Sequence, residues 1–287
     1  MKKIQYKKDD YTYQMLPHTR KQVFGDVIKL HFSSMLWLGF VLFLFSLPFF
    51  IIDLLQDVYL AKILEEQVDV KENVSEVLGK IVAVSNIKAS LEIILYVIFS
   101  IGFSGVQRIL RQYAWEKNVY FKVDFGLGIK QNGMQTSTIF FVGGLGVAIC
   151  TVSYNAAIQI QGWSSMLYYV PLCIFALFIV PLLVLTSICT PVYSNKLIGN
   201  LRIALAMYFK YPLKVLCLIL CCGVLLAPQF VPGALVRFIG RTVLCFVAPF
   251  FCLGLDLVCY DMLDEVVNRK LHPELVGIGT FPYNQMD

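Results

Sequence analysis

The sequence predicts an all-α, polytopic membrane protein, built as a six-helix transmembrane bundle with short interfacial helices. Hydrophobic residues make up 58% of the 287-residue chain and charged residues 15%, whereas a soluble domain has about 45–50% and about 25%. The apolar residues are clustered into runs of about 20, the length that a helix needs to cross a hydrocarbon core of about 30 Å. Open strands are excluded, because they would leave backbone groups unpaired in lipid.

Six segments have the required length and apolar character. The first, MLWLGFVLFLFSLPFFII, and the fourth, MLYYVPLCIFALFIVPLLVL, contain no charged residue. The second contains Glu92, and the sixth contains Arg241 and Asp256. The predicted spans lie near 31–52, 87–107, 136–157, 166–189, 212–231 and 235–259.

Short amphipathic segments precede several of these spans. The phrase FGDVIK at 24–29 returns almost unchanged as FGLGIK at 125–130, in both cases shortly before an apolar run. The apolar residues of each phrase fall on one side of a helix, which is typical of a helix lying in the membrane interface. A looser example lies at 197–214. Chance similarity between apolar sequences is the alternative explanation.

The remaining regions follow from these spans. Residues 1–30 are expected to form a basic cytoplasmic tail and an interfacial helix, 31–259 the transmembrane domain, and 260–287 a second cytoplasmic tail. The connection at 53–86 is acidic and is expected to lie outside. Its apolar residues from Val74 onward have helical spacing, which predicts a helix that extends the second span outward.

Lysine and arginine predict the orientation in the membrane. Most of the 24 basic residues lie in the N-terminal tail, the connections 108–135 and 190–214, and the C-terminal tail. The connections on the other side are acidic or uncharged. Because positive residues favour the inner side, both termini are expected in the cytoplasm, and an even number of spans agrees with that. The predicted location is therefore the cytoplasmic membrane.

One inner connection resembles a known family. From Gly102 the chain reads GFSGVQRILRQYAWEKNVYFKVDFGLGIKQNGMQ. After a glycine-bearing helix end and a basic stretch come Trp115, Asp124, Phe125, Gly128, Lys130 and Asn132. This pattern resembles the signature region of the YesL-like family of bacterial membrane proteins. The resemblance implies a multi-span protein of the bacterial cytoplasmic membrane, often associated with carbohydrate uptake systems, and it transfers no catalytic residue. The long acidic connection departs from the family pattern.

This motif has a structural and a functional interpretation. Trp115 and the neighbouring basic residues suit the headgroup layer, and Asp124 can cap a helix that begins at Phe125. The functional interpretation is a cytoplasmic docking surface for a partner protein.

Charged residues inside the spans are further candidates. A charge at bilayer depth costs about 2.5–3.5 kcal/mol on insertion scales, so it rarely faces lipid. At helical spacing, polar and small residues form one stripe on the second span, which includes Gln107, and another on the sixth. We expect the stripes to face each other. Glu92 would then pair with Arg241 near the outer end, and Asp256 with Arg108 or Arg111 near the inner end. The alternative is that Arg241 and Asp256 snorkel to the two surfaces without contact.

The sequence contains no motif that indicates catalysis, cofactor binding or nucleic-acid binding. It contains no G-x-S-x-G, no H-E-x-x-H and no phosphate-binding glycine loop, and no nucleic-acid-binding motif. We expect a non-catalytic accessory or scaffold component of a bacterial solute-uptake or envelope system. Its expected partners are the lipid bilayer and transporter subunits or other membrane proteins. The alternative is a transporter or channel with a polar path between spans two and six.

Overall fold

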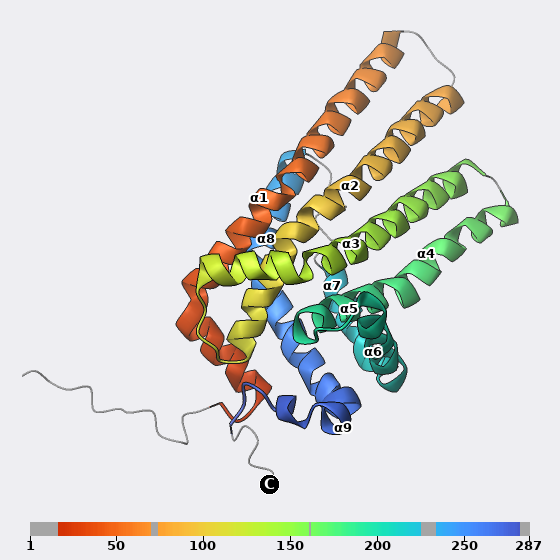
Figure 1. Ribbon diagram of the computed structural model, residues 1–287. Helices are drawn as coiled ribbons and strands as arrows, with labels where there is room; N and C mark the ends of the chain where they lie inside the picture. Colours follow the sequence, from red (N-terminus) through yellow and green to blue (C-terminus); the bar gives the residue numbers. More distant parts are fainter. Residues whose placement is uncertain (1–16, 70–73, 161, 225–233, 282–287) are drawn as a thin grey trace, which may run out of the picture.

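The computed structural model describes residues 17–69, 74–160, 162–224 and 234–281 (Figure 1). Throughout these ranges the secondary structure is helical, without a strand. Five helices are long and apolar enough to cross a membrane, or six if a sharply bent pair counts as one span. The prediction of an all-α, multi-span membrane protein is therefore confirmed.

The first two spans form a long antiparallel hairpin. Helix α1 (Arg20–Asp69) contains 50 residues and α2 (Val74–Ala114) contains 41. At 1.5 Å per residue α1 is about 75 Å long, more than twice the thickness of a hydrocarbon core. The acidic connection at 53–86 is thus helical on both sides of residues 70–73. The helix that contains the second predicted span does begin well before residue 87, at Val74.

A break divides α1 near its beginning. His31 has φ −122° and ψ 20°, which is not helical. Its ring stacks on Tyr113 of α2, with ring centroids 4.4 Å apart. The residues before the break include the phrase FGDVIK, so this phrase does form a short helical segment leading into the first span.

Helix α3 (Phe121–Gln159) begins with the second phrase, FGLGIK. In Figure 1 its first part crosses the inner end of the hairpin before the helix turns to run beside α2. Gly128 makes the crossing possible, because a Cβ there would lie 2.9 Å from both Gly105 Cα and Ser104 O. Helices with small residues at the contact can approach this closely.

The fourth span is broken into short pieces. A 3₁₀ turn (Trp163–Tyr169) leads into α4 (Val170–Ile174), a π-helical turn (Phe175–Ile179) and α5 (Val180–Val192). Pro181 has no N–H to offer the carbonyl of Leu177, four residues earlier. The hydroxyl of Tyr208 donates to that carbonyl instead, at 2.9 Å. A side chain from a neighbouring helix therefore stabilises the irregular turn.

The fifth predicted span falls in the bent pair. Helices α6 (Leu197–Lys210) and α7 (Pro212–Val224) meet at 106°. Tyr211 between them has φ −130° and ψ 52°, in keeping with the exclusion of helical geometry before a proline. The predicted span 212–231 thus coincides with α7 at its beginning, and its last residues lie outside the described ranges.

Helix α8 (Ala234–Leu263) is the last span. A π-helical turn (Asp264–Asn268), α9 (Arg269–Leu271) and a 3₁₀ turn (Pro273–Leu275) follow it. Helix α8 packs mainly on α1, and α2 packs mainly on α3. At the α1–α8 contact a Cβ on Gly39 would lie 2.6 Å from Phe246 Cα.

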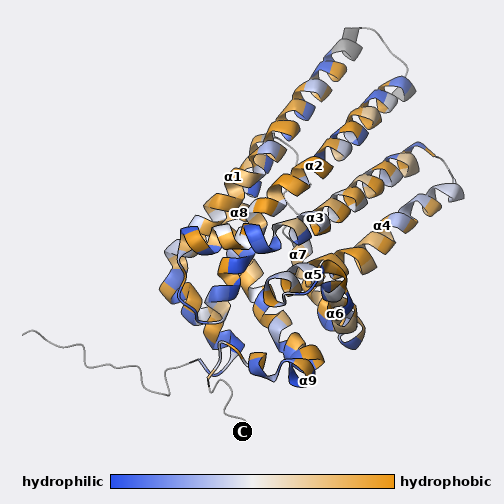
Figure 2. Cartoon of the chain, viewed as in Figure 1, coloured by the Kyte–Doolittle hydropathy of each residue, from blue (hydrophilic) through white to orange (hydrophobic). Residues whose placement is uncertain are grey.

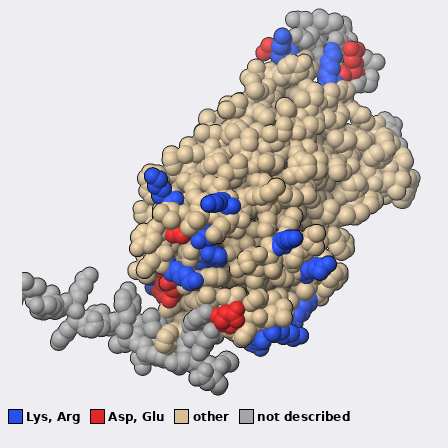
Figure 3. All heavy atoms as spheres, viewed as in Figure 1, with Lys and Arg blue, Asp and Glu red and all other residues tan. Residues whose placement is uncertain are grey.

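Hydrophobic residues predominate along the long helices (Figure 2), and many of their large apolar side chains are exposed. Trp37, Ile94 and Phe141 are exposed, one each on α1, α2 and α3. In Figure 3 a broad uncharged band separates a mixed-charge tip from the end at which lysine and arginine gather. This distribution is typical of helices whose middle part faces lipid.

The two ends of the described chain meet at the basic end of the bundle, which is named the inner end after its predicted orientation, and the opposite end the outer end. The N–H of Phe281 donates to the carbonyl of Pro17 at 2.7 Å. Arg20, at the start of α1, contacts Asp264 at 3.0 Å and Asp261 at 3.4 Å. The C-terminal turn is therefore fastened to the first helix.

Candidate functional site

The outer charges form a network that joins three helices. Asp53 of α1 pairs with Arg241 of α8 and, at 2.5 Å, with Lys88 of α2. Lys88 also lies 3.6 Å from Glu92, one turn further along its own helix. The structure thus brings Glu92 and Arg241 into one network, but the carboxylate that pairs with Arg241 is that of Asp53.

Sequence spacing contains a signal for this network. Asp53 and Asp57 are four residues apart, and so are Arg237 and Arg241. Because residues i and i+4 share a helix face, two antiparallel helices can match such pairs in order. The structure does so, with Asp57 bound to Arg237 and Asp53 to Arg241. We missed the signal because both aspartates were assigned to the outer connection, whereas α1 continues through them.

The inner charges also have partners other than those expected. Arg108 lies 3.8 Å from Asp124 and donates to the side chain of Gln131. Arg111 donates to the carbonyl of Pro191, and its guanidinium lies 4.7 Å from the centre of the Trp115 ring. Both arginines are thus engaged away from Asp256.

Asp256 instead contacts a neutral residue. The Gln107 side-chain amide donates to Asp256 Oδ1 at 3.0 Å, and the whole Asp256 residue is 1% exposed. Within the described part of the chain, neither Asp256 Oδ2 nor Gln107 Oε1 has a hydrogen-bond partner. Gln107 was placed on the polar stripe of the second span, but an arginine had been preferred as the partner because it carries charge.

The two stripes therefore meet near their inner ends. Further out, Ser100 of α2 faces α3, where its hydroxyl lies 2.7 Å from that of Ser137. The outer part of the α8 stripe faces α1, with Cys245 Sγ 3.4 Å from Ser46 Oγ. The expected contact between spans two and six exists at Gln107 and Asp256. Towards the outer end the two stripes contact different helices, α3 and α1.

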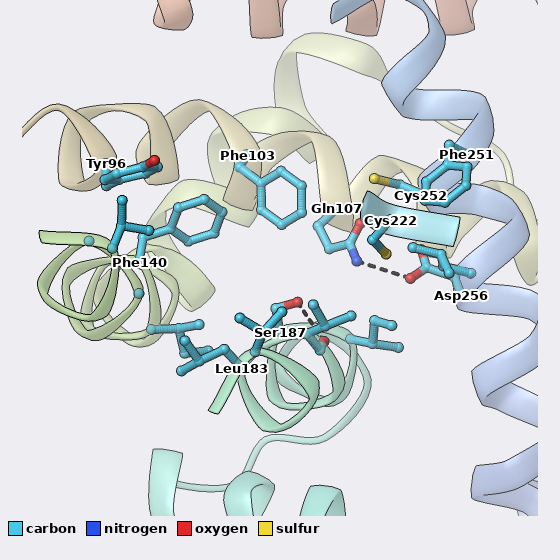
Figure 4. A pocket seen from close by; sticks show the side chains of 18 of the residues that line it. Tyr96, Phe103, Gln107, Phe140, Leu183, Ser187, Cys222, Phe251, Cys252 and Asp256 are labelled. Atoms are coloured by element: carbon cyan, nitrogen blue, oxygen red, sulfur yellow. Dashed lines mark hydrogen bonds between the residues drawn. The ribbon is translucent and has the colours of Figure 1, made fainter. Parts of the chain in front are cut away.

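A cavity of about 350 Å³ opens beside this contact (Figure 4). Its walls come from α2, α3, the π-helical turn, α5, α7 and α8 and are mostly apolar. In Figure 4, Gln107 and Asp256 lie together at one side of the space, with Phe103 and Phe140 along the wall. The cavity thus combines an apolar interior with two hydrogen-bond acceptors that have no donor among the described residues.

The residues of the inner motif mostly hold α2 and α3 together. Asp124 accepts a hydrogen bond from the backbone N–H of Tyr120 at 2.8 Å, at the start of α3. The prediction that Asp124 is the cap of a helix beginning at Phe125 is wrong, because α3 begins at Phe121 with Tyr120 as its N-cap. Asp124 lies in the first turn, where its carboxylate reaches back to the backbone of Tyr120. The ring of Phe125 lies over Gly105, where a Cβ would come within 2.4 Å of it. Gly128 is buried in the same crossing.

The rest of the motif lies nearer the surface. Lys130 is exposed, and Asn132 and Trp115 are half-buried. Tyr120 is 73% exposed and Val123 is 60% exposed. The first turns of α3 therefore present aromatic, apolar and basic side chains at the inner end of the bundle.

Metal-ligating side chains are not grouped in the described ranges, which contain no cluster of three or more His, Cys, Asp or Glu placed to hold an ion.

Comparison of the chain with family models, with curated proteins and with solved structures gives no match.

Proposed function

We propose that this integral membrane protein acts by binding, as a non-catalytic accessory or scaffold component of a bacterial solute-uptake or envelope system. The observation that carries the proposal is that the charged groups in or beside the spans, apart from Asp256, mostly bind one another. Asp53 joins Lys88 and Arg241 across three helices, and Arg108 lies against Asp124. Charges engaged in this way hold helices in place, whereas a solute path needs polar groups that face a passage.

The inner end supplies a surface for a partner. Lys122 is exposed beside Tyr120 and Val123 at the start of α3, and Lys130 is exposed about two turns further along the helix. Aromatic residues are enriched at protein interfaces, and exposed lysines suit a negatively charged partner. The assignment to a bacterial uptake or envelope system rests on the YesL-like resemblance of this region.

We infer that this end lies in the cytoplasm. Lysine and arginine gather at the end where the described termini meet (Figure 3). Because positive residues favour the inner side of a membrane, this arrangement supports a multi-pass protein with both ends inside. Thiol labelling of cysteines introduced at 18 and 62 in intact cells tests the orientation. If the cysteine at 18 is labelled from outside and the cysteine at 62 is protected, the orientation is the reverse of the one inferred.

Copurification tests the scaffold proposal. The tagged chain is purified from native membranes in mild detergent, together with a Lys122→Glu/Lys130→Glu variant. We expect the wild type to retain a stoichiometric membrane partner and the variant to lose it. Lys62→Glu, an exposed change on α1 towards the other end, is the matched control and should keep the partner. Purification of the wild type without any stable partner contradicts the proposal.

A transporter is the second candidate, and Asp256 favours it. A buried carboxylate with a free oxygen beside a cavity is the kind of group that marks substrate or ion pathways. Proteoliposome flux separates the two candidates. Solute movement that is abolished by Asp256→Asn or Glu92→Gln would replace the scaffold proposal with a transport function.

A further inference from the structure

The cavity beside Asp256 has the size and lining of a small-molecule site. Its volume of about 350 Å³ falls within the range of about 300–1,000 Å³ that is usual for ligand pockets. Phe103 of α2, Phe140 of α3 and Phe175 of the π-helical turn contribute aromatic rings to its wall. Such a lining favours an apolar ligand body, and aromatic faces also attract a cation.

Gln107 and Asp256 form the polar corner of the cavity, and this corner determines which head group a ligand can have. Gln107 uses its amide N–H to bind Asp256 Oδ1. This leaves Asp256 Oδ2 and Gln107 Oε1 as acceptors without a donor in the described ranges. A buried acceptor costs free energy until it receives a hydrogen bond, and a buried carboxylate costs more until it meets a positive charge.

The cationic side chains nearby do not fill this role. Arg111 is bound to the Pro191 carbonyl and lies over Trp115, and Arg108 is bound to Asp124 and Gln131. The complement that is missing is therefore a group with several N–H donors and a positive charge. A carboxylate or phosphate ligand is disfavoured, because it would bring further acceptors to a corner where hydrogen-bond donors are missing.

We propose that this cavity binds a single-tailed lipophilic primary amine. The ammonium group donates to Asp256 and Gln107, and the alkyl tail lies against the aromatic wall. This site is independent of the proposed scaffold function. A protein that binds partners at its inner surface can do so with or without such a ligand in its bundle.

A matched ligand series tests the proposal on the full-length protein in detergent. Decylamine, decan-1-ol, decanoate and decyltrimethylammonium share a tail and differ in the head group. Native mass spectrometry counts bound molecules, and thermal unfolding reports stabilisation. We expect one decylamine per chain, binding at least about tenfold more tightly than decan-1-ol, because hydrogen bonds to a charged group exceed neutral ones. Decyltrimethylammonium should be weaker than decylamine because it has no N–H, and decanoate should not bind.

Two variants locate the site. Asp256→Asn should reduce decylamine affinity by at least about tenfold while leaving decan-1-ol binding unchanged. Val184→Phe, which adds bulk to the cavity wall, should lower the affinity for both decylamine and decan-1-ol. Glu65→Gln, an exposed carboxyl on α1, is the control for a general loss of negative charge and should bind decylamine like the wild type.

The outcomes decide the proposal even if Asp256→Asn does not fold. Equal affinity of the wild type for decylamine and decan-1-ol overturns it, and so does tight binding of decanoate. Decylamine binding that survives in Asp256→Asn places the amine elsewhere and also overturns it. None of these results depends on whether a partner copurifies, so this site and the scaffold proposal succeed or fail separately.

Discussion

Asp53 of α1 holds Arg241 of α8 and Lys88 of α2 at the same time. The side chains of Asp53 and Arg241 are only 12% and 13% exposed. This contact explains how an arginine can stand within a span that is otherwise apolar. One carboxylate ties the first, second and last spans together at the outer part of the bundle.

A double-mutant cycle measures this contact. Asp53→Asn should lower the free energy of unfolding by about 3–5 kcal/mol, because it removes the carboxylate shared by Arg241 and Lys88. Arg241→Gln should cost less, because Asp53 still pairs with Lys88. The double variant should lose less than the sum, with a coupling of about 1–3 kcal/mol. Thermal or denaturant unfolding in detergent gives the values. The cycle of Glu92→Gln with Arg241→Gln should show weaker coupling. Stronger coupling in that second cycle would make Glu92 the true partner.

The sequence was sufficient to predict the spans but not the partners of their charges. The apolar runs predict helices because an unpaired backbone is excluded from lipid, and this argument needs no knowledge of the neighbours. Pairing depends on which helices touch and at what height. Asp53 lies just past the apolar run of the first span, and hydropathy alone could not show that α1 continues through it.

The inner site was predicted in part. Gln107 and Asp256 were placed on facing stripes, and these residues do meet. The cavity beside them could not be predicted, because its wall includes Phe175 in a π-helical turn and residues of five helices. The shape of that space depends on side-chain packing between segments that are distant in sequence.

The fastening of the two ends can be tested at Arg20. Arg20 is 8% exposed and contacts Asp264 at 3.0 Å. Arg20→Gln should destabilise the fold by about 3 kcal/mol, because Asp264 loses its buried cationic partner. It should also speed proteolysis of the C-terminal turn, which mass spectrometry of the fragments would show.

Lys21→Gln is the matched control for Arg20, since Lys21 is exposed at the start of the same helix. It should change stability by no more than about 0.5 kcal/mol. If both variants behave alike, the ion pair does not hold the C-terminal turn in place.

The close crossing of α2 and α3 predicts a sharp difference between two glycines. A Cβ on Gly128 would lie 2.9 Å from the backbone of Gly105, whereas one on Gly126 would meet no atom within 4 Å. Gly128→Val should therefore force the helices apart and cost about 1–3 kcal/mol or more. Gly126→Ala should raise stability by up to about 1 kcal/mol, because alanine favours a helix over glycine. Unfolding midpoints of the two variants check this. A tolerated valine at 128 would show that the helices are less closely packed.

Glu116 makes the stability of the inner end depend on pH. Burial, and then the charge of Asp26, raise the pKa of Glu116 above its ordinary value of 4.5. The folded chain therefore keeps this proton at pH values where the unfolded chain has released it. The stabilising contribution is complete in acid and is lost as the pH rises from about 4.5 through the folded pKa. Glu116→Gln, which does not titrate, should flatten this decline in the unfolding midpoint, and Asp26→Asn should flatten it in part. An unchanged slope in Glu116→Gln would mean that this carboxyl ionises alike in the folded and unfolded chains.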